Sequence, residues 1–379
     1  MDKILITGGA GFIGSNLALK LLSKGYEVTV LDNLSPQIHG GNPEKDSTLF
    51  CSIKGKVTFI HGSVTSKDDW LAALNGQDAV IHLAAETGTG QSMYDIERYN
   101  KVNVLGTAIL WDILANREHK INKVIVASSR AVYGEGKYMC SKDGVVYPLS
   151  RKEKNMNKGD FKVKCPICNR NVTRLATTED SKIHPTSIYG FTKQAQEEIS
   201  MIAGKSLNIP VVALRYQNVY GPGQSLSNPY TGILSIFSTR ILNGNEIHIF
   251  EDGKECRDFI YINDVVDATI LVLESSAKVN FQYYNVGTGV PTDIILVAKT
   301  LRDEYHFTVP IKITGNYRLG DIRDNYADTS KIKNELGFVP KNDFAQGISQ
   351  FVKWVNMQQV NVDKYDSSIE EMKKKGLFK

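Results

Sequence analysis

The chain of 379 residues has little of several features that would place a protein in a special class. Its five cysteines, an odd number, argue against a framework of disulfide bonds. Its net charge of +4 is too small to indicate a nucleic-acid partner. No apolar run is long enough to span a bilayer, so we expect no membrane segment. The short, glycine-broken N-terminal run is unlike a secretory signal, and we predict a cytoplasmic protein.

What the sequence does contain is an alternation of apolar runs and helical patterns. Buried strands are predicted at residues 3–7, 27–31, 57–60, 79–85, 123–129 and 211–215, and helices at 16–22 and 103–116. This order is typical of an α/β protein with a doubly wound parallel sheet, and ligands are expected beyond the carboxyl ends of the strands. Asp32, Ala84, Ala85, Ser128 and Ser129 stand at such ends.

Three glycines connect the first strand to the first helix. Gly8 permits the tight turn, Gly11 lets a pyrophosphate approach, and Gly14 allows the helix to pack on the strand. The backbone N–H groups at such a helix start point at an anion. Asp32 ends the second strand, where a carboxylate binds a ribose 2′-hydroxyl and repels a 2′-phosphate. These features predict a Rossmann domain that binds NAD rather than NADP.

A tyrosine and a lysine stand four residues apart, at Tyr189 and Lys193. On a helix they share one face. A neighbouring ammonium favours the phenolate, so Tyr189 is predicted to act as an acid and base on an alcohol. Ser129, at the end of the fifth strand, is predicted to orient the substrate oxygen.

Six motifs in the same order resemble the extended short-chain dehydrogenase/reductase family, and within it the nucleotide-sugar epimerases and dehydratases. They are residues 8–14, 82–85, 128–134, Tyr189 with Lys193, 214–222 and 257–261. The resemblance implies bound NAD, a nucleotide-sugar substrate, a homodimer, and Ser129, Tyr189 and Lys193 as catalytic residues. It also implies a cofactor-binding set of Gly8, Gly11, Phe12, Ile13, Gly14, Asp32, Asn33, Ser63, Val64, Leu83, Ala84, Ala85, Asn103, Ser128, Tyr189, Lys193 and Tyr216. Ser63 stands where the family usually has an aspartate.

The substrate-binding residues are also assigned by the resemblance. Asn218 corresponds to a nucleotide-clamping asparagine, and Arg257 and Arg318 to arginines at the diphosphate. The alternatives are a turn residue for Asn218 and ion pairs for the two arginines. Segments 88–94, 135–148, 165–168 and 185–189 resemble a subgroup that includes dTDP-L-rhamnose 4-epimerases. This resemblance adds Thr87, Gln91 and Ser92 to Ser129 as expected substrate contacts, with Ser187 near the sugar.

The residues after Ser129 decide between the reactions of this family. Dehydratases carry an Asp-Glu pair there, whereas this chain has Arg130 and Ala131. We therefore predict a 4-epimerase in which Tyr189 deprotonates the carbon-4 hydroxyl, a 4-keto sugar forms and turns, and Tyr189 returns the proton. The alternative is a nucleotide-sugar oxidoreductase of the 4-keto reductase type. Arg130 either contacts substrate or points away.

We predict an NAD-binding domain over 1–215, interrupted by a polar insertion at 135–185, and a smaller C-terminal substrate-binding lobe over 216–379. Segments around 258–286 are expected to return to the first domain. The insertion carries Cys140, Cys165 and Cys168, and the pair at 165 and 168 has the spacing of zinc ligands. His184 is a candidate fourth ligand, and Asp143 stands where the subgroup has a histidine. The alternative is a reduced pair of thiols in a loop.

Overall fold

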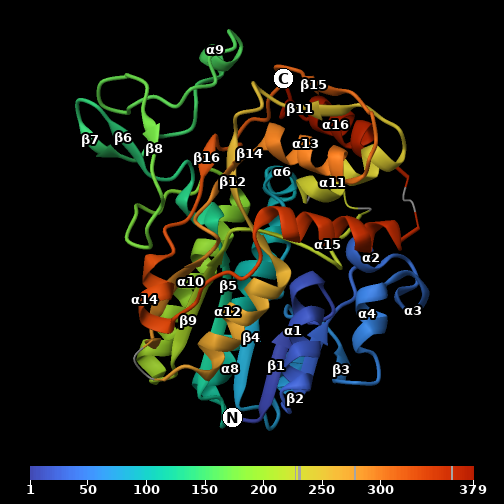
Figure 1. Cartoon of the computed structure of the whole chain (residues 1–379). Coiled ribbons are helices and arrows are strands. Elements are labelled where there is room, and N and C mark those ends of the chain that lie inside the picture. The colour runs from blue at the N-terminus through green and yellow to red at the C-terminus, as the bar shows by residue number, and fades with distance from the viewer. Residues whose placement is uncertain (227, 229–231, 277–278, 360–361) are drawn as a thin grey trace.

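The computed structural model describes residues 1–379 except 227, 229–231, 277–278 and 360–361. Its centre is a seven-stranded sheet in which every neighbouring pair of strands is parallel (Figure 1). The strand order is β13-β9-β5-β4-β1-β2-β3. The bounds are β1 Lys3–Thr7, β2 Glu27–Asp32, β3 Thr58–His61, β4 Ala79–His82, β5 Lys123–Ser129, β9 Val211–Tyr216 and β13 Gln282–Val286.

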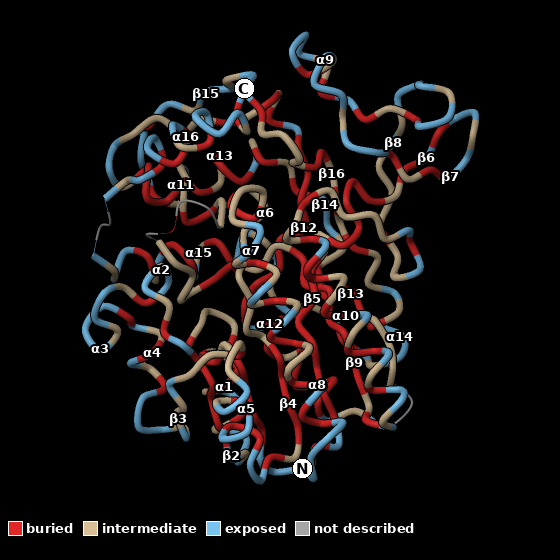
Figure 2. The backbone as a smooth tube through the Cα atoms, turned by 180° about the vertical axis from the view of Figure 1, so that it is seen from behind, coloured by how far each residue is buried: buried red, intermediate tan, exposed pale blue. Residues whose placement is uncertain are grey.

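Helices cover both faces of this sheet, as a parallel sheet requires. One apolar core joins the sheet to α1 and α12, and a second joins its other face to α5, α8 and α10. Figure 2 shows the central strands as the most continuously buried part of the backbone. The bounds are α1 Phe12–Ser23, α5 Lys67–Leu74, α8 Gly106–Asn116, α10 Ile188–Leu207 and α12 Ile262–Glu274; short helices are α2 Pro36–His39, α3 Pro43–Asp46, α4 Thr48–Ile53, α6 Thr89–Ser92 and η2 Arg130–Tyr133.

The strand order turns at the boundary between β1 and β4. From β1 the chain proceeds through β2 and β3 on one side, and from β4 through β5 and β9 on the other. Loops at this switch point diverge, so a crevice opens beyond the carboxyl ends of the strands. The predicted fold class is confirmed. The fourth strand ends at His82 rather than at residue 85, which leaves Leu83, Ala84 and Ala85 in the loop beside the crevice.

The helix predicted over 103–116 begins earlier than the sequence pattern indicated. It runs from α7, Ile96–Tyr99, through a π-helical turn, η1 Asn100–Leu105, into α8. The π turn carries Asn103, which is fully buried. A π turn in a helix often marks a functional region. The apolar periodicity of α8 alone did not reveal it.

The C-terminal part of the chain forms a smaller lobe above the carboxyl ends of the strands (Figure 1). Its main sheet has the order β10-β12-β14, with β16 also paired to β12, and β11 pairs with β15. Residues 218–220, which include the possible turn residue Asn218, form a strand because they pair with β12. The bounds are β10 Asn218–Tyr220, β11 Ile247–Ile249, β12 Cys256–Tyr261, β14 Pro291–Asp293, β15 Ile311–Ile313, β16 Asp324–Asn325, α11 Ile233–Leu242, α13 Ile294–Glu304, α14 Ser330–Leu336, α15 Phe344–Asn356 and α16 Tyr365–Lys374.

The insertion projects from the body of the molecule, with its strands on the upper left of Figure 1 and α9 at the top. It contains β6 Tyr138–Cys140, β7 Gly144–Val146, α9 Glu153–Met156 and β8 Thr173–Arg174, and the three strands pair in the order β7-β6-β8. Much of its backbone is exposed in Figure 2. Across the described residues, no helix combines the length and apolarity needed to cross a membrane.

Candidate active site

A cavity of about 360 Å³ lies beyond the carboxyl ends of β1, β2, β4, β5 and β9. It gathers all but one of the residues predicted to bind the cofactor, although these come from segments spread over more than 200 positions. The predicted residues that line it are Gly8, Gly11, Phe12, Ile13, Gly14, Asp32, Asn33, Ser63, Val64, Leu83, Ala84, Ala85, Thr87, Ser128, Ser129, Tyr189, Lys193 and Tyr216.

The glycine loop has the geometry that an anion requires. Gly8 has a φ of +67°, and a Cβ on Gly14 would lie 2.4 Å from the Gly8 carbonyl oxygen. Only glycine therefore lets helix α1 start so close to β1. Gly11 caps α1 without a side-chain hydrogen bond. The N–H groups of the first turn are thus left for a ligand at the positive end of the helix.

Asp32 is fixed at the other wall of the same cavity. Its carboxylate accepts hydrogen bonds from the backbone N–H of Ala10 at 3.0 Å and of Leu34 at 2.9 Å. His39 lies 3.8 Å from it, and burial lowers the pKa of this imidazole. The two N–H donors fix the orientation of the Asp32 carboxylate. It is placed to accept hydrogen bonds from a ribose and to repel a phosphate.

Helix α10 presents Tyr189 and Lys193 to the cavity from one face. Its N-terminus is held by two serines. The Ser187 hydroxyl accepts from the N–H of Gly190 at 3.1 Å, and the Ser92 hydroxyl accepts from the N–H of Tyr189 at 3.1 Å. Gly190 lets α10 lie close to η2, because a Cβ on residue 190 would lie 2.6 Å from the Ala131 carbonyl oxygen. The start of α10 is therefore rigid.

The electrostatics of the pair differ from the simple expectation. Burial raises the pKa of the Tyr189 phenol, while a hydrogen bond to Ser129 and the charge of Arg130 act in the opposite direction. Burial also lowers the pKa of Lys193 to about 7, although Glu197 opposes this. The Lys193 ammonium donates to the Ala127 carbonyl at 2.9 Å. The positive charge that lowers the pKa of Tyr189 therefore comes from Arg130, and not from Lys193 as the spacing of the pair predicts.

A buried polar chain beneath the pair ties α10 to the sheet. The His82 Nδ1 lies 2.7 Å from the Thr7 hydroxyl, and its Nε2 lies 2.9 Å from the Thr107 hydroxyl. Gln196, one turn after Lys193, donates to the same Thr107 hydroxyl at 2.8 Å. Burial lowers the pKa of His82 to about 3, so its ring is neutral. These buried hydrogen bonds fix the position of α10 relative to the strand ends.

Three arginines meet around one carboxylate next to Ser129, and we call Arg130, Arg257 and Arg318 with Asp321 the arginine cluster. Arg257 Nη2 lies 3.2 Å and Arg318 Nη2 lies 2.8 Å from the Asp321 carboxylate. Burial acts to raise the pKa of Asp321, yet the arginines together hold it well below its usual range. Arg130 Nε donates to the Asn218 side chain at 2.6 Å. Arg130 itself does not line the cavity.

Several residues predicted to touch the substrate do not line the cavity. These are Gln91, Ser92, Asn218, Arg257 and Arg318. Many of their polar atoms already have partners within the chain. Gln91 accepts from Gln37 at 3.0 Å, the Ser92 hydroxyl accepts from the Tyr189 N–H, and Arg257 also donates to the carbonyls of residues 256, 322 and 323. Of the predicted substrate contacts, Thr87 and Ser129 do line it.

Asn103 is the one predicted cofactor-binding residue outside the cavity lining. Its side-chain oxygen accepts from the Glu86 N–H at 2.8 Å. Its side-chain nitrogen donates to the Glu86 carbonyl at 3.1 Å and to the Thr192 hydroxyl at 2.9 Å. It joins the loop after β4 to α10. The geometry places it as a support of the site rather than at its surface.

The sequence analysis missed Gln217, which follows β9 and lines the cavity. Among the described residues it finds no side-chain partner, although it is only 5% exposed. A buried amide without a partner is costly and suggests a ligand contact. Its place directly after a strand end was the signal available. Glu135, the remaining acid near Ser129 in sequence, faces Arg151 and the backbone of Arg323 instead, and does not line the cavity.

The three cysteines of the insertion are brought together far from this cavity, and Asp143 joins them. The candidate ligand His184 does not. Its ring nitrogens lie 3.0 Å from the Lys182 carbonyl and 3.2 Å from the Pro148 carbonyl. The sequence distance from Cys168 to His184 is short, but the chain returns to the body of the protein before reaching it.

Comparison with known proteins identifies the family. The model of the "NAD dependent epimerase/dehydratase family" matches residues 4–151 and 169–287. The chain belongs to this family. A curated relative, the dTDP-L-rhamnose 4-epimerase of Burkholderia thailandensis, is 35% identical over 356 residues, which cover 93% of this chain and 94% of the relative. The stretch between the two matched segments, residues 152–168, contains Cys165 and Cys168, whereas Cys140 lies in the first matched segment.

Solved structures agree. The UDP-glucuronic acid 4-epimerase of Bacillus cereus, in complex with UDP-glucuronic acid and NAD, is 25% identical with a TM-score of 0.76 and covers 93% of this chain and 99% of its own. The UDP-glucose 4-epimerase of Thermotoga maritima with UDP-glucose is 29% identical with a TM-score of 0.74 and covers 93% and 98%. These findings confirm the predicted family, the NAD cofactor and the class of enzyme, an NAD-dependent nucleotide-sugar epimerase.

Proposed function

We propose that this epimerase inverts carbon 4 of dTDP-L-rhamnose or a related 6-deoxy sugar nucleotide. The observation that carries the reaction type is the convergence of Ser129, Tyr189 and Lys193 on the cavity whose far wall holds the glycine loop and Asp32. The support for the sugar is the 35% identity to a dTDP-L-rhamnose 4-epimerase over nearly the whole chain. The lack of a second acid beside Ser129 supports epimerisation over loss of water.

We assign the residues these roles. The glycine loop and the first turn of α1 hold the pyrophosphate of NAD, and Asp32 holds the adenosine ribose. Lys193 holds the nicotinamide ribose. NAD, when bound, takes up hydride from carbon 4 and gives it back. In our proposal residues 1–215 with the segments around 258–286 bind the cofactor, and the rest of 216–379 binds the substrate.

Tyr189 removes the proton of the carbon-4 hydroxyl and later returns it. Ser129 donates a hydrogen bond to the same oxygen, which orients it and stabilises the developing charge. Lys193 and Arg130 supply positive charge that offsets the effect of burial on the Tyr189 phenol. The arginine cluster and Asn218 hold the diphosphate while the 4-keto sugar turns.

The first experiment is incubation of the purified protein with dTDP-L-rhamnose deuterated at carbon 4, without added NAD. We expect proton NMR to show the carbon-4 epimer with the deuterium retained, because the same bound cofactor returns the hydride. UDP-glucose is the comparison substrate and should turn over more slowly. Accumulated absorbance of reduced nicotinamide without an epimer would favour the oxidoreductase instead.

We also propose a homodimer formed by α10 and the helix that contains Asn103. Phe191 and Ile202 lie three helical turns apart on α10 and are both exposed, and Ile96 and Leu105 are exposed on the adjoining helix. Apolar side chains gathered on two packed helices are typical of an interface.

Ile202→Glu tests this proposal, with Leu296→Glu, an equally apolar exposed position on α13, as the control. Light scattering should give a dimer for the parent and control and a monomer for Ile202→Glu. A monomeric parent protein would contradict the proposal.

We further propose a cytoplasmic location. All five cysteines are free thiols, as is usual in a reducing compartment. Fractionation of expressing cells with an antibody to the chain tests this.

A further inference from the structure

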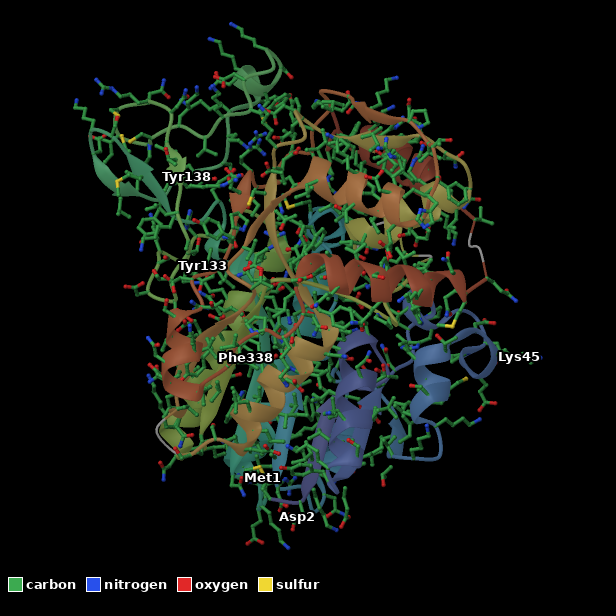
Figure 3. All side chains as sticks on the ribbon, viewed as in Figure 1. Met1, Asp2, Lys45, Tyr133, Tyr138 and Phe338 are labelled. Atoms are coloured by element: carbon green, nitrogen blue, oxygen red, sulfur yellow. The ribbon has the colours of Figure 1, made fainter. Side chains whose placement is uncertain are left out.

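The outer end of the insertion gathers four side chains whose oxygen and sulfur atoms are those that zinc prefers. The ligand atoms of Cys140, Asp143, Cys165 and Cys168 all lie within 4.8 Å of one another. Figure 3 shows sulfur atoms clustered there, beyond Tyr138. The arrangement is unrelated to the cavity, since none of the four lines it.

The distances within this group fit a tetrahedron. Cys140 Sγ lies 3.5 Å from Cys168 Sγ, and the Asp143 carboxylate lies 3.3 Å from Cys140 Sγ and 3.1 Å from Cys165 Sγ. Zinc bound to sulfur at about 2.3 Å and to oxygen at about 2.0 Å separates its ligands by about 3.5–3.8 Å. The three short distances differ from these values by a few tenths of an ångström, and all four ligand atoms lie within 4.8 Å of one another, so small rotations of the side chains are enough to admit the ion.

The four residues lie in two turns that have the same ligand spacing and a similar backbone conformation. Each turn has two ligands three positions apart, followed by a residue with positive φ. In the first turn Gly144, with φ 75°, follows Asp143, and in the second Asn169, with φ 60°, follows Cys168. The spacing of two such pairs, 21 residues apart, is close to that of zinc ribbons.

Backbone N–H groups point at the first sulfur of each turn. The N–H of Lys142 lies 3.5 Å from Cys140 Sγ, and that of Ile167 lies 3.4 Å from Cys165 Sγ. Such donors stabilise a thiolate, which is the form of cysteine that binds metal. A repeated N–H to sulfur contact is not needed by a pair of neutral thiols in a loop.

The outer end of the insertion has a small apolar core of its own. Its apolar cluster has only five buried members, two of which are ligand cysteines: Tyr138, Cys140, Val146, Val163 and Cys165. Its strands are three, three and two residues long. A core of this size does not stabilise a fold without a metal or a covalent link.

We infer that Cys140, Asp143, Cys165 and Cys168 bind one structural zinc ion that fixes the insertion. The site is closed, with four protein ligands and no position for a substrate, as is typical of structural zinc. It does not depend on which sugar the enzyme uses.

The test is the metal content of the full-length protein, purified without chelator and measured by plasma mass spectrometry. We expect one zinc ion per chain in the parent protein. The double variant Cys165→Ser, Cys168→Ser should lose at least about nine-tenths of it, since half of the ligand set is gone. Cys51→Ser is the matched control, because Cys51 is an exposed thiol outside the cluster, and should keep its zinc.

A second measurement separates binding from folding. In cobalt-substituted protein, thiolate-to-cobalt charge-transfer bands should appear in the parent and be lost in the double variant. Asp143→His, which restores a common zinc ligand, should keep the metal, whereas Asp143→Ala should weaken binding about 10–100-fold. Hydrogen exchange over residues 138–174 should rise in the metal-free variant and remain unchanged around the cavity.

Three results would overturn the inference. The first is a metal-free parent protein whose three insertion thiols all react with a thiol reagent and that binds no added zinc. The second is a mass two hydrogens lower, which would reveal a Cys140–Cys168 disulfide. The third is equal metal content in the parent and the double variant. Loss of epimerase activity would bear on the proposed function alone, because the readouts here are metal, spectrum and exchange.

Discussion

The cofactor wall of the cavity and the arginine cluster are neighbours, but they use their polar groups differently. On the cofactor wall the helix α1 N-terminus has no side-chain cap and Gln217 has no side-chain partner among the described residues. In the arginine cluster, Arg257 already donates to three carbonyls and a carboxylate. The polar groups of the cofactor wall are left open for a ligand, whereas those of the arginine cluster are paired with other groups of the protein.

In the proposed function, NAD and the diphosphate of the substrate therefore meet different surfaces. A dinucleotide finds donors left open by the backbone, whose position the sheet fixes. A diphosphate that enters the arginine cluster competes with Asp321 for the same guanidinium groups. Arg318 is the member best placed to change partners, because its side chain is one-third exposed and its Nε has no partner among the described residues.

The largest effect is expected from Tyr189→Phe, which removes the acid and base while leaving the packing of the ring. Turnover should fall about 10²–10⁴-fold, the usual contribution of such a group. NAD content and thermal stability should stay unchanged. The control is Tyr26→Phe, whose hydroxyl bonds to Glu274 at the opposite end of the sheet. Full turnover by Tyr189→Phe would contradict the proposed mechanism.

A comparison within the arginine cluster comes next. Arg257→Gln should lower the free energy of unfolding by about 3–5 kcal/mol, because it leaves buried carbonyls and a carboxylate unpaired. Arg318→Gln, at a partly exposed pair, should change it by less than about 1 kcal/mol while raising KM roughly tenfold.

Urea denaturation and steady-state kinetics measure both variants. Equal stability losses, or a change in KM confined to Arg257→Gln, would show that the difference between structural and ligand-binding arginines is drawn wrongly.

The pH dependence of stability probes the cofactor wall. Folded Lys193 has a pKa of about 7, whereas an unfolded lysine keeps its proton to about pH 10.4. Between these values the unfolded chain binds more protons, so the contribution of Lys193 to stability rises with pH; at or below pH 7 its full cost is present. In NAD-stripped protein, the free energy of unfolding of Lys193→Met relative to the parent should therefore be highest at pH 7 and below.

Urea unfolding of both proteins from about pH 6 to 9.5 isolates this one group, because other titrations cancel in the difference. The stability difference between variant and parent should shrink as the pH rises. A difference that is constant with pH would mean that Lys193 keeps its charge in the folded protein.

A smaller effect than that of Arg257→Gln is expected from Gly14→Ala, which should lower the free energy of unfolding by about 1–3 kcal/mol and lower the retained NAD, because its Cβ meets the Gly8 carbonyl. Gly41→Ala is the control, since nothing lies within 4 Å of a Cβ there. Thermal unfolding and the NAD released on denaturation measure both. An unchanged Gly14→Ala would show that α1 can move away from β1 without loss of the site.

Local patterns were enough to predict six strands of the central sheet, the glycine turn and the pairing of Tyr189 with Lys193. They work because parallel strands buried on both faces are continuously apolar, and a helix repeats every four residues regardless of its neighbours. Asn103, Ser92 and Gln91 were predicted to contact a ligand, and in the structure they lie outside the cavity lining and bond to other side chains or backbone groups. Local patterns do not record such partners, because most of them are far away in the sequence.

The sequence by itself determined the fold class, the cofactor and the family, since each depends on residues that act within one strand, one turn or one helix. The tertiary structure alone decided that Arg257 is held by carbonyls, that Gln217 faces the cavity, and that Asp143 rather than His184 joins the cysteines. These are contacts between segments separated by many residues. Their distances follow from how the chain packs, and no local pattern records them.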